Sequence, residues 1–143
     1  MKRLSLVLGS ALCISPLHAQ ENPPVAVKQI TSATVNSSGQ PIRLPQGNAR
    51  VAVSTYDIAA GATLPEHKHP FPRFGYVLAG TLRITNTVTG EAHEFKPGDF
   101  ILESVGQWHK ATTGGAEPVK LLVIDPTEPH KDNVILKKAS EAR

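Results

Sequence analysis

Apolar and polar residues alternate along much of the chain, which is the pattern of half-buried β-strands. Residues 50–58 show it clearly, since Val51, Val53 and Thr55 stand at every second position. Similar runs recur between glycine and proline residues, which favour turns. The pattern predicts strands over 25–35, 50–58, 77–85, 91–95, 100–103 and 119–125.

Short strands at this regular spacing are typical of a β-sandwich or a β-barrel. Thr89-Gly90 is predicted to form the turn of a hairpin, and residues 37–41 a loop. Only residues 133–143 are interpreted as a possible short helix. No internal repeat or linker divides the sequence, so we expect a single all-β domain.

The first nineteen residues have the features of a secretory signal peptide. Lys2 and Arg3 supply the positive charge, and residues 4–17 form a mostly apolar run. That run is shorter than the roughly 20 residues that a membrane span needs. We therefore predict cleavage after Ala19, a periplasmic or secreted protein, and no stable membrane anchor in the mature form.

Removal of this segment changes the composition. Cys13 is the only cysteine, so the mature chain would have neither a disulfide nor a reactive thiol. Without Lys2 and Arg3 the 15 basic residues become 13, against 12 acidic ones. No basic stripe with interleaved aromatic residues occurs, so we do not expect nucleic acid as a partner.

The segment 61–69 carries the strongest chemical signal. His67 and His69 stand two positions apart in an extended stretch, so both side chains point to the same face. Two such imidazoles can bind one metal ion at about 2.0–2.1 Å. A third histidine, His109, follows a Pro97-Gly98-Asp99 turn and could complete the set of ligands.

These residues resemble the two sequence motifs of the cupin superfamily, in its small, secreted, single-domain form. The first motif is matched at Gly61, His67, His69 and Gly80. The second is matched more loosely, by Pro97-Gly98-Asp99 and His109 without the motif's asparagine.

The resemblance implies an antiparallel jelly-roll barrel. A divalent transition metal (zinc, iron, manganese, nickel or copper) would be held in its mouth by His67, His69 and His109. We expect the lead-in and first strands over 20–48, the barrel over 49–126 and a tail over 127–143.

Position 73 departs from the family pattern, because Arg73 stands where the first motif has a glutamate. A guanidinium group stays protonated and has no lone pair for a metal. Glu103, at the end of the predicted strand 100–103, is the best replacement, as a metal ligand or as a proton carrier.

If the family's alternation holds, Arg73 points into the barrel. A buried cation beside a metal ion requires an anion, which could be Glu103 or a substrate carboxylate. The other interpretation is that the prolines on either side of Phe71 shift the alternation and leave Arg73 at the surface.

The same alternation turns Phe74, Tyr76 and Leu78 outward as an apolar row. This is more apolar surface than a monomer usually exposes. Two interpretations remain open: the row packs beneath the N-terminal strand, or it forms a homodimer interface.

Three further residues have ordinary explanations. His93 lies in a charged hairpin and His130 in the tail, and we interpret both as solvated side chains. Trp108, next to His109, could stack on a substrate or close the barrel mouth.

Two classes of function fit these observations. The first is a metal-dependent enzyme (oxygenase, decarboxylase, lyase or isomerase) acting on a small anionic molecule such as a carboxylate. Arg73 would then orient the substrate and Glu103 would move a proton. The second is a non-catalytic periplasmic module that binds a metal or a small ligand. The fold itself does not choose between them.

Overall fold

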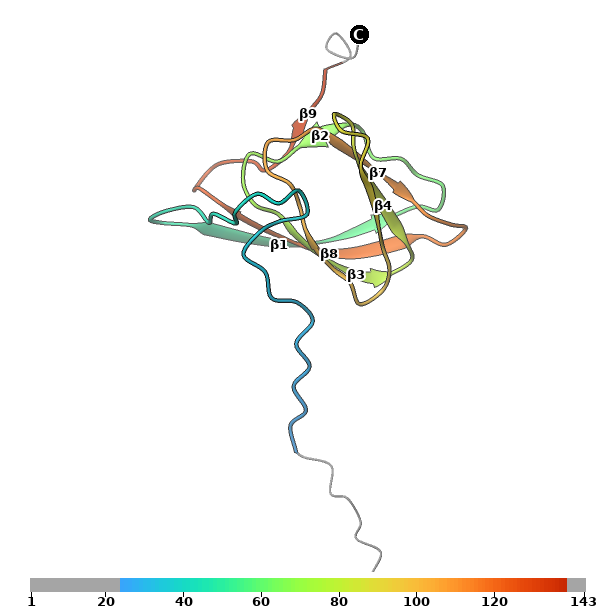
Figure 1. Cartoon of the computed structure of the whole chain (residues 1–143), viewed down its shortest axis with the longest axis horizontal. Coiled ribbons are helices and arrows are strands. Elements are labelled where there is room, and N and C mark those ends of the chain that lie inside the picture. Colours follow the sequence, from blue (N-terminus) through green and yellow to red (C-terminus); the bar gives the residue numbers. More distant parts are fainter. Residues whose placement is uncertain (1–23, 139–143) are drawn as a thin grey trace, which may run out of the picture.

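The computed structural model describes residues 24–138, and within this range the chain forms nine β-strands and no helix (Figure 1). The strands are β1 (Arg50–Ile58), β2 (His67–Lys68), β3 (Phe74–Ala79), β4 (Leu82–Asn86), β5 (Ala92–Phe95), β6 (Phe100–Leu102), β7 (His109–Thr113), β8 (Val119–Thr127) and β9 (Ile135–Leu136).

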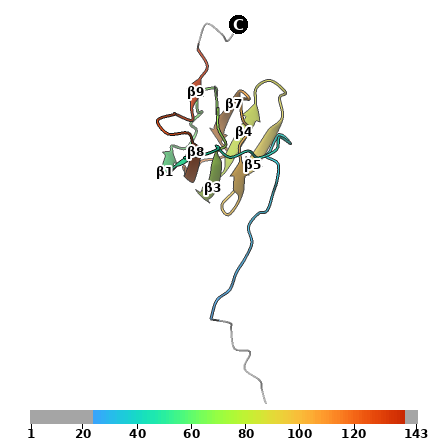
Figure 2. The ribbon, with the colours of Figure 1, turned by 90° about the vertical axis from the view of Figure 1, so that its left-hand side faces the viewer.

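The strands form two sheets that face each other (Figure 2). The first has the order β1-β8-β3-β6 and the second the order β5-β4-β7-β2-β9, and neighbouring strands are antiparallel in both. The predicted all-β, antiparallel jelly-roll architecture is confirmed.

Alternate side chains of the long strands fill the space between the sheets. In β8, Val119, Leu121 and Val123 are buried, and the residues between them are not. Burying one such side chain contributes about 1.5–3 kcal/mol. The buried core consists of Ile58, Val77, Leu82, Ile101, Ala111, Val119, Leu121 and Val123.

The predicted hairpin turn at Thr89-Gly90 is confirmed. It joins β4 to β5, and Gly90 has a φ of 77°, in the left-handed region that favours glycine. The Asn86 side chain accepts hydrogen bonds from the backbone amides of Val88 and Thr89. This local bonding explains why turn residues alone located the hairpin.

The strand predicted over 25–35 is wrong. Residues 24–34 form no strand, and the segment runs away from the barrel in both ribbon views (Figures 1 and 2). Val25, Val27 and Ile30 are exposed, so their apolar alternation has no sheet to pack against. Alternation favours a strand only where a partner supplies the hydrogen bonds.

The strand predicted over 77–85 is divided into β3 and β4 by a turn at Gly80. Gly80 has a φ of 71°, and a Cβ atom there would clash with the carbonyl oxygen of Pro118.

The helix predicted over 133–143 is wrong where the structure describes it, because residues 135–136 form β9. Pairing with β2 overrides the local preference of this segment.

The outward row on β3 lies on the outer face of the first sheet. Phe74 stacks on Phe100 of β6 with ring centroids 6.1 Å apart, and Leu78 is exposed. No strand over 25–35 covers the row, so that interpretation is wrong. The homodimer interpretation stays a prediction.

The predicted signal peptide over residues 1–19 lies outside the described residues. Within residues 24–138, no helix is long and apolar enough to cross a membrane.

Candidate metal centre

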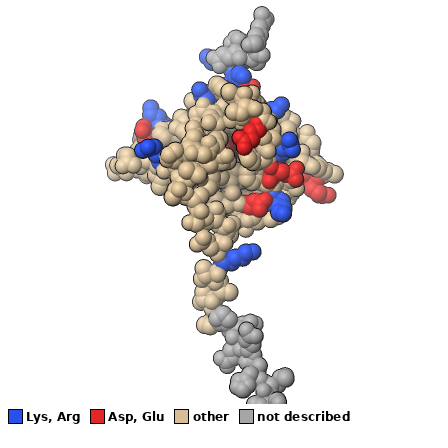
Figure 3. Space-filling view, in the orientation of Figure 1, with Lys and Arg blue, Asp and Glu red and all other residues tan. Residues whose placement is uncertain are grey.

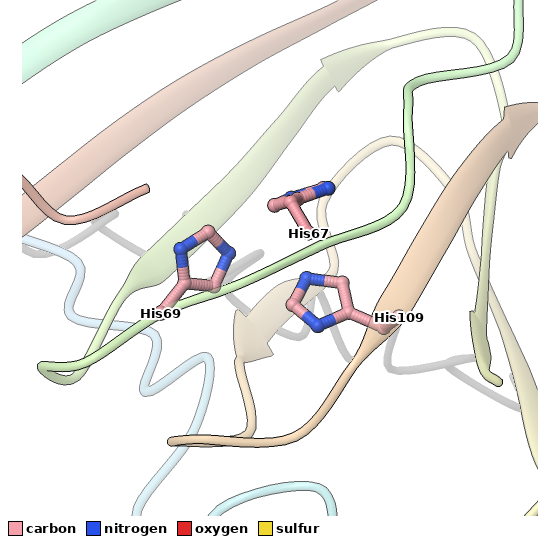
Figure 4. A group of neighbouring side chains, drawn as sticks. All are labelled: His67, His69 and His109. Carbon is pink, nitrogen blue, oxygen red and sulfur yellow. The ribbon is translucent and has the colours of Figure 1, made fainter. Parts of the chain in front are cut away.

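Three histidines from two neighbouring strands converge between the sheets (Figure 4). His67 belongs to β2, His69 follows that strand directly, and His109 begins β7. Because β2 and β7 pair with His67 opposite His109, the antiparallel register itself brings two of the rings together. The third ring follows from the alternation of side chains, which puts His69 on the same face as His67.

The cluster has the dimensions of a metal site. One ring nitrogen from each histidine lies within 4.8 Å of the others. The ring centroids are 4.4–4.9 Å apart, and all three residues are buried. The three side chains could hold a metal ion, as the resemblance implied.

Each of the three rings is oriented by a backbone carbonyl. Nδ1 of His67 donates to the oxygen of Pro65 (2.7 Å), and Nδ1 of His109 donates to that of Gln107 (3.0 Å). For His69 the acceptor is the carbonyl of Asn133 (2.6 Å). A carbonyl can only accept, so Nδ1 carries the proton, and Nε2 remains as the nitrogen that can bind a metal.

Glu103 extends from the end of β6 to the same cluster. Its Oε2 atom lies 3.0 Å from Nε2 of His69 and 3.2 Å from Nε2 of His109. The carboxylate therefore lies beside the nitrogens that face a shared ion. The sequence predicted that Glu103 belongs to the site, and its two roles, metal ligand or proton carrier, stay predictions.

The charges of the cluster are strongly coupled. Burial of Glu103 acts to raise its pKa, but the close contacts with His109 and His69 outweigh burial and hold that pKa well below its ordinary range. Burial acts to lower the pKa of His109, but the contact with Glu103 outweighs it and raises the pKa. For His67, burial lowers the pKa to about 4. His67 is thus a neutral imidazole near pH 7, as a metal ligand must be.

The donor set fits a transition-metal ion. Nε2 of His109 is buried and makes no well-formed hydrogen bond with the described residues, although Glu103 lies close by. Two acceptor atoms at such a distance repel each other unless a proton or a cation lies between them. Three imidazole nitrogens, with a carboxylate beside two of them, suit zinc, iron, manganese, nickel or copper.

Arg73 points into the barrel, as the family alternation predicted, and only 5% of it is exposed. The surface interpretation of Arg73 is therefore wrong. The alternation continues through Gly75 and Val77 and ends at an irregularity before Ala79, which is exposed.

The anion paired with Arg73 is Asp125 of β8, which the sequence analysis did not single out. Nε and Nη2 of Arg73 donate to Oδ1 and Oδ2 of Asp125, both at 2.8 Å. Burial acts to lower the pKa of Arg73, but this hydrogen-bonded pair outweighs it and raises the pKa. The sequence did indicate that Asp125 points inward, because Asp125 stands two positions after Val123 in the alternating series Val119, Leu121 and Val123, whose side chains are buried.

Mostly apolar walls surround the cluster. One narrow cavity reaches His67, His109, Arg73 and Glu103. A second opens beneath residues 37–38 and also ends at Glu103 and His109. The apolar residues that line the first cavity, with Tyr56, are Leu64, Leu82, Ile84, Ala111, Leu121 and Val123.

Trp108 does not line either of these cavities. Its ring lies under Nζ of Lys68 (4.5 Å) and Nζ of Lys137 (5.8 Å). His93, by contrast, lines the second cavity and pairs with Glu91 at 3.1 Å, although it is largely exposed. The hairpin brings His93 there because it pairs with Ile84, whose side chain faces the same cavity.

Basic and acidic side chains are interspersed on the face shown in Figure 3. They do not gather there into one basic patch.

Comparisons with known proteins agree with the fold and the motifs. The family model of the cupin domain matches residues 54–125, about half of the chain. No match is found among curated protein sequences.

Solved structures with the same fold include several enzymes. The polyketide cyclase RemF from Streptomyces resistomycificus is 27% identical, with a TM-score of 0.52, over 71% of this chain and 72% of that one. The DMSP lyase DddQ from Ruegeria pomeroyi is 23% identical, with a TM-score of 0.52, over 60% of this chain. Oxalate decarboxylase from Bacillus subtilis, described with Mn(II) centres, is 23% identical, with a TM-score of 0.51, over 60% of this chain.

This chain covers only 42% of the lyase and 23% of the decarboxylase. At these identities the likeness to both shows the fold alone. The family is established by the match of the cupin model, which includes all three histidines of the cluster. The chain belongs to the cupin family.

Proposed function

We propose that this protein is an exported, metal-dependent cupin enzyme that acts on a small organic molecule. The observation that carries the proposal is the convergence of three histidines, each with Nδ1 bonded to a carbonyl, beside the Glu103 carboxylate and an apolar cavity. His67, His69 and His109 would hold the ion through Nε2. When bound, the metal supplies a Lewis acid with positions open to substrate.

Glu103 is suited to move a proton. It lines both cavities and lies beside two of the histidines, so it can exchange a proton with a substrate bound in either. Its low pKa makes it a carboxylate at neutral pH, the protonation state that can accept a proton.

Arg73 is suited to orient the substrate. Asp125 uses Nε and Nη2 of Arg73, so Nη1 is the guanidinium nitrogen outside that pair. The ion pair of Arg73 and Asp125 carries no net charge. A divalent metal ion with Glu103 as its neighbouring carboxylate carries one net positive charge. A substrate with a single anionic oxygen and an otherwise apolar body would match both this charge and the aliphatic walls.

Two further parts of the proposal concern the whole protein. The features of residues 1–19 support export to the periplasm or beyond. The outward apolar row Phe74, Tyr76 and Leu78, in which Leu78 is exposed and the two aromatic residues are half-buried, supports a homodimer.

Elemental analysis of the protein purified from its native compartment tests the proposal, followed by turnover and oxygen-uptake assays on small carboxylates and related compounds. We expect a transition metal near one equivalent per chain. Glu103→Gln should retain the metal and lose about 10²- to 10⁴-fold in turnover, the usual contribution of a general acid or base. Glu94→Gln, an exposed carboxylate on β5, is the matched control and should lose neither.

The alternatives separate in the same experiment. Loss of metal from Glu103→Gln makes Glu103 a ligand. Bound metal without turnover on any compound would favour the non-catalytic binding module. Purified protein without metal, and unable to take it up, would refute the proposed function.

A further inference from the structure

The C-terminal segment 133–137 folds back onto the strand that carries two of the histidines. β9 pairs with β2, with Leu136 opposite His67 and Ile135 opposite Lys68. Both β9 side chains are exposed, so apolar burial does not explain why the segment lies there. The pairing with β2 and polar contacts at the two ends of the segment hold it in place.

At the first end, Asn133 is 6% exposed, and every polar group of its side chain has a partner. Oδ1 accepts from the amide of Phe71 (2.9 Å), and Nδ2 donates to the carbonyl of Pro72 (3.1 Å). Nδ2 also donates to Oδ1 of Asp125 (2.6 Å). This pattern requires one acceptor and two donors on one short side chain, which only asparagine supplies.

The carbonyl of the same residue accepts the hydrogen bond from Nδ1 of His69. His67 and His109 differ, since each is bonded to a carbonyl only two residues earlier in the chain. The acceptor for His69 lies 64 positions away in the chain. His69 is thus the histidine of the cluster whose proton position depends on a distant segment.

At the second end, Lys137 binds Glu66, the residue before His67. Its amide donates to the carbonyl of Glu66 (2.9 Å), and its Nζ pairs with the carboxylate of the same residue (2.9 Å). The segment is therefore tied to both flanks of the His67–His69 stretch.

From these contacts we propose that Asn133 is a positioning residue of the metal centre. Its side chain locks the segment against residues 71–72 and Asp125, so that its carbonyl holds the Nδ1 proton of His69 and directs Nε2 toward the other two histidines. The inference rests on the proposed function only in taking the cluster to bind a metal.

Asn133→Ala tests this inference, with Asp132→Ala, an exposed neighbour, as the matched control. The affinity for Co²⁺ and Zn²⁺ would be measured by competition with a chelator. We expect Asn133→Ala to lose ten- to a hundredfold, the usual effect of removing a partner behind a metal ligand, and Asp132→Ala to be unchanged.

The second measurement is the protonation of the histidine rings, read from long-range ¹H–¹⁵N correlation spectra of the metal-free protein. In the native chain Nδ1 of His69 should carry a proton, and Asn133→Ala should lose or shift this signal. The Nδ1 signals of His67 and His109 should stay, because their acceptors are local. Asn133→Asp should resemble Asn133→Ala, since a carboxylate can accept from Phe71 but cannot donate to Pro72.

Unchanged metal affinity in Asn133→Ala, or an unprotonated Nδ1 of His69 in the native protein, would overturn the inference. If the alanine variant does not fold, the native spectrum and Asn133→Asp decide. If the native protein binds no metal, the proposed function fails, but the comparison of the His69 signals still decides the role of Asn133.

Discussion

The two sheets of this barrel are built in different ways. The first contains the two nine-residue strands β1 and β8, and its inner face supplies most of the buried aliphatic core. The second contains β2 and β9, each of only two residues, yet it carries all three histidines on or next to its strands. Long strands with apolar faces stabilise the fold, while the histidines depend on short strands held by hydrogen bonds.

The difference shows how a small domain can separate stability from chemistry. The charged side chains that the first sheet and its strand ends direct toward the site are Arg73, Asp125 and Glu103, and two of these form an ion pair with each other. The second sheet has few large apolar side chains at β2 and β9 and relies on backbone and carbonyl contacts instead. Changes to the first sheet should therefore lower stability, and changes to the second should lower metal affinity.

The largest expected effect is on the second sheet. Replacing His67, His69 or His109 singly by alanine should remove bound metal completely after dialysis, as measured by elemental analysis. The loss of metal affinity should exceed the ten- to hundredfold loss expected from changing a residue that only hydrogen-bonds to a metal ligand. His93→Ala and His130→Ala are the controls. Equal metal retention in all five variants would refute the three-histidine site.

On the first sheet, Asp125→Ala should cost about 3–5 kcal/mol in the free energy of unfolding, because it leaves the buried Arg73 without its anion. Denaturant titration of the metal-free protein measures this. Asp57→Ala, which breaks only the exposed pair with Lys120, should change stability by less than about 1 kcal/mol. Similar losses in both variants would mean that the Arg73 pair is not buried as described.

Ile101→Ala should cost about 2–5 kcal/mol through the cavity that it leaves in the core, since the residue is 1% exposed. Val53→Ala, on the exposed face of the same sheet, should stay within about 0.5 kcal/mol. Because Ile101 offers no ligand atom, the folded variant should keep its metal. A folded Ile101→Ala that loses metal would contradict the separation of the two sheets.

The smallest expected effect is that of Lys137→Ala. Its ion pair with Glu66 is partly solvated, so we expect a loss of at most about 1 kcal/mol, which salt should reduce further. Thermal unfolding at low and high ionic strength measures it, with Lys138→Ala as the control. A loss several times larger would show that the outer contacts, and not Asn133, hold the C-terminal segment.

The sequence alone determined those features that depend on neighbours along the chain. Alternation located β1, β5, β6 and β8 to within two residues at either end, and the spacing of His67 and His69 put both on one face. The inward direction of Arg73 followed from the same period of two. These are local consequences of strand geometry, and so they can be deduced without knowing which strands are neighbours.

Other features were decided only by the tertiary structure. Arg73 meets Asp125 because β3 lies beside β8, and His69 meets Asn133 because β9 returns to β2, across 52 and 64 positions of the chain. Residues 25–35 alternate as a strand does but have no sheet to join. Alternation determines which way a side chain points. The partner of that side chain depends on the order of strands in each sheet and on how the two sheets pack, and these are properties of the whole domain.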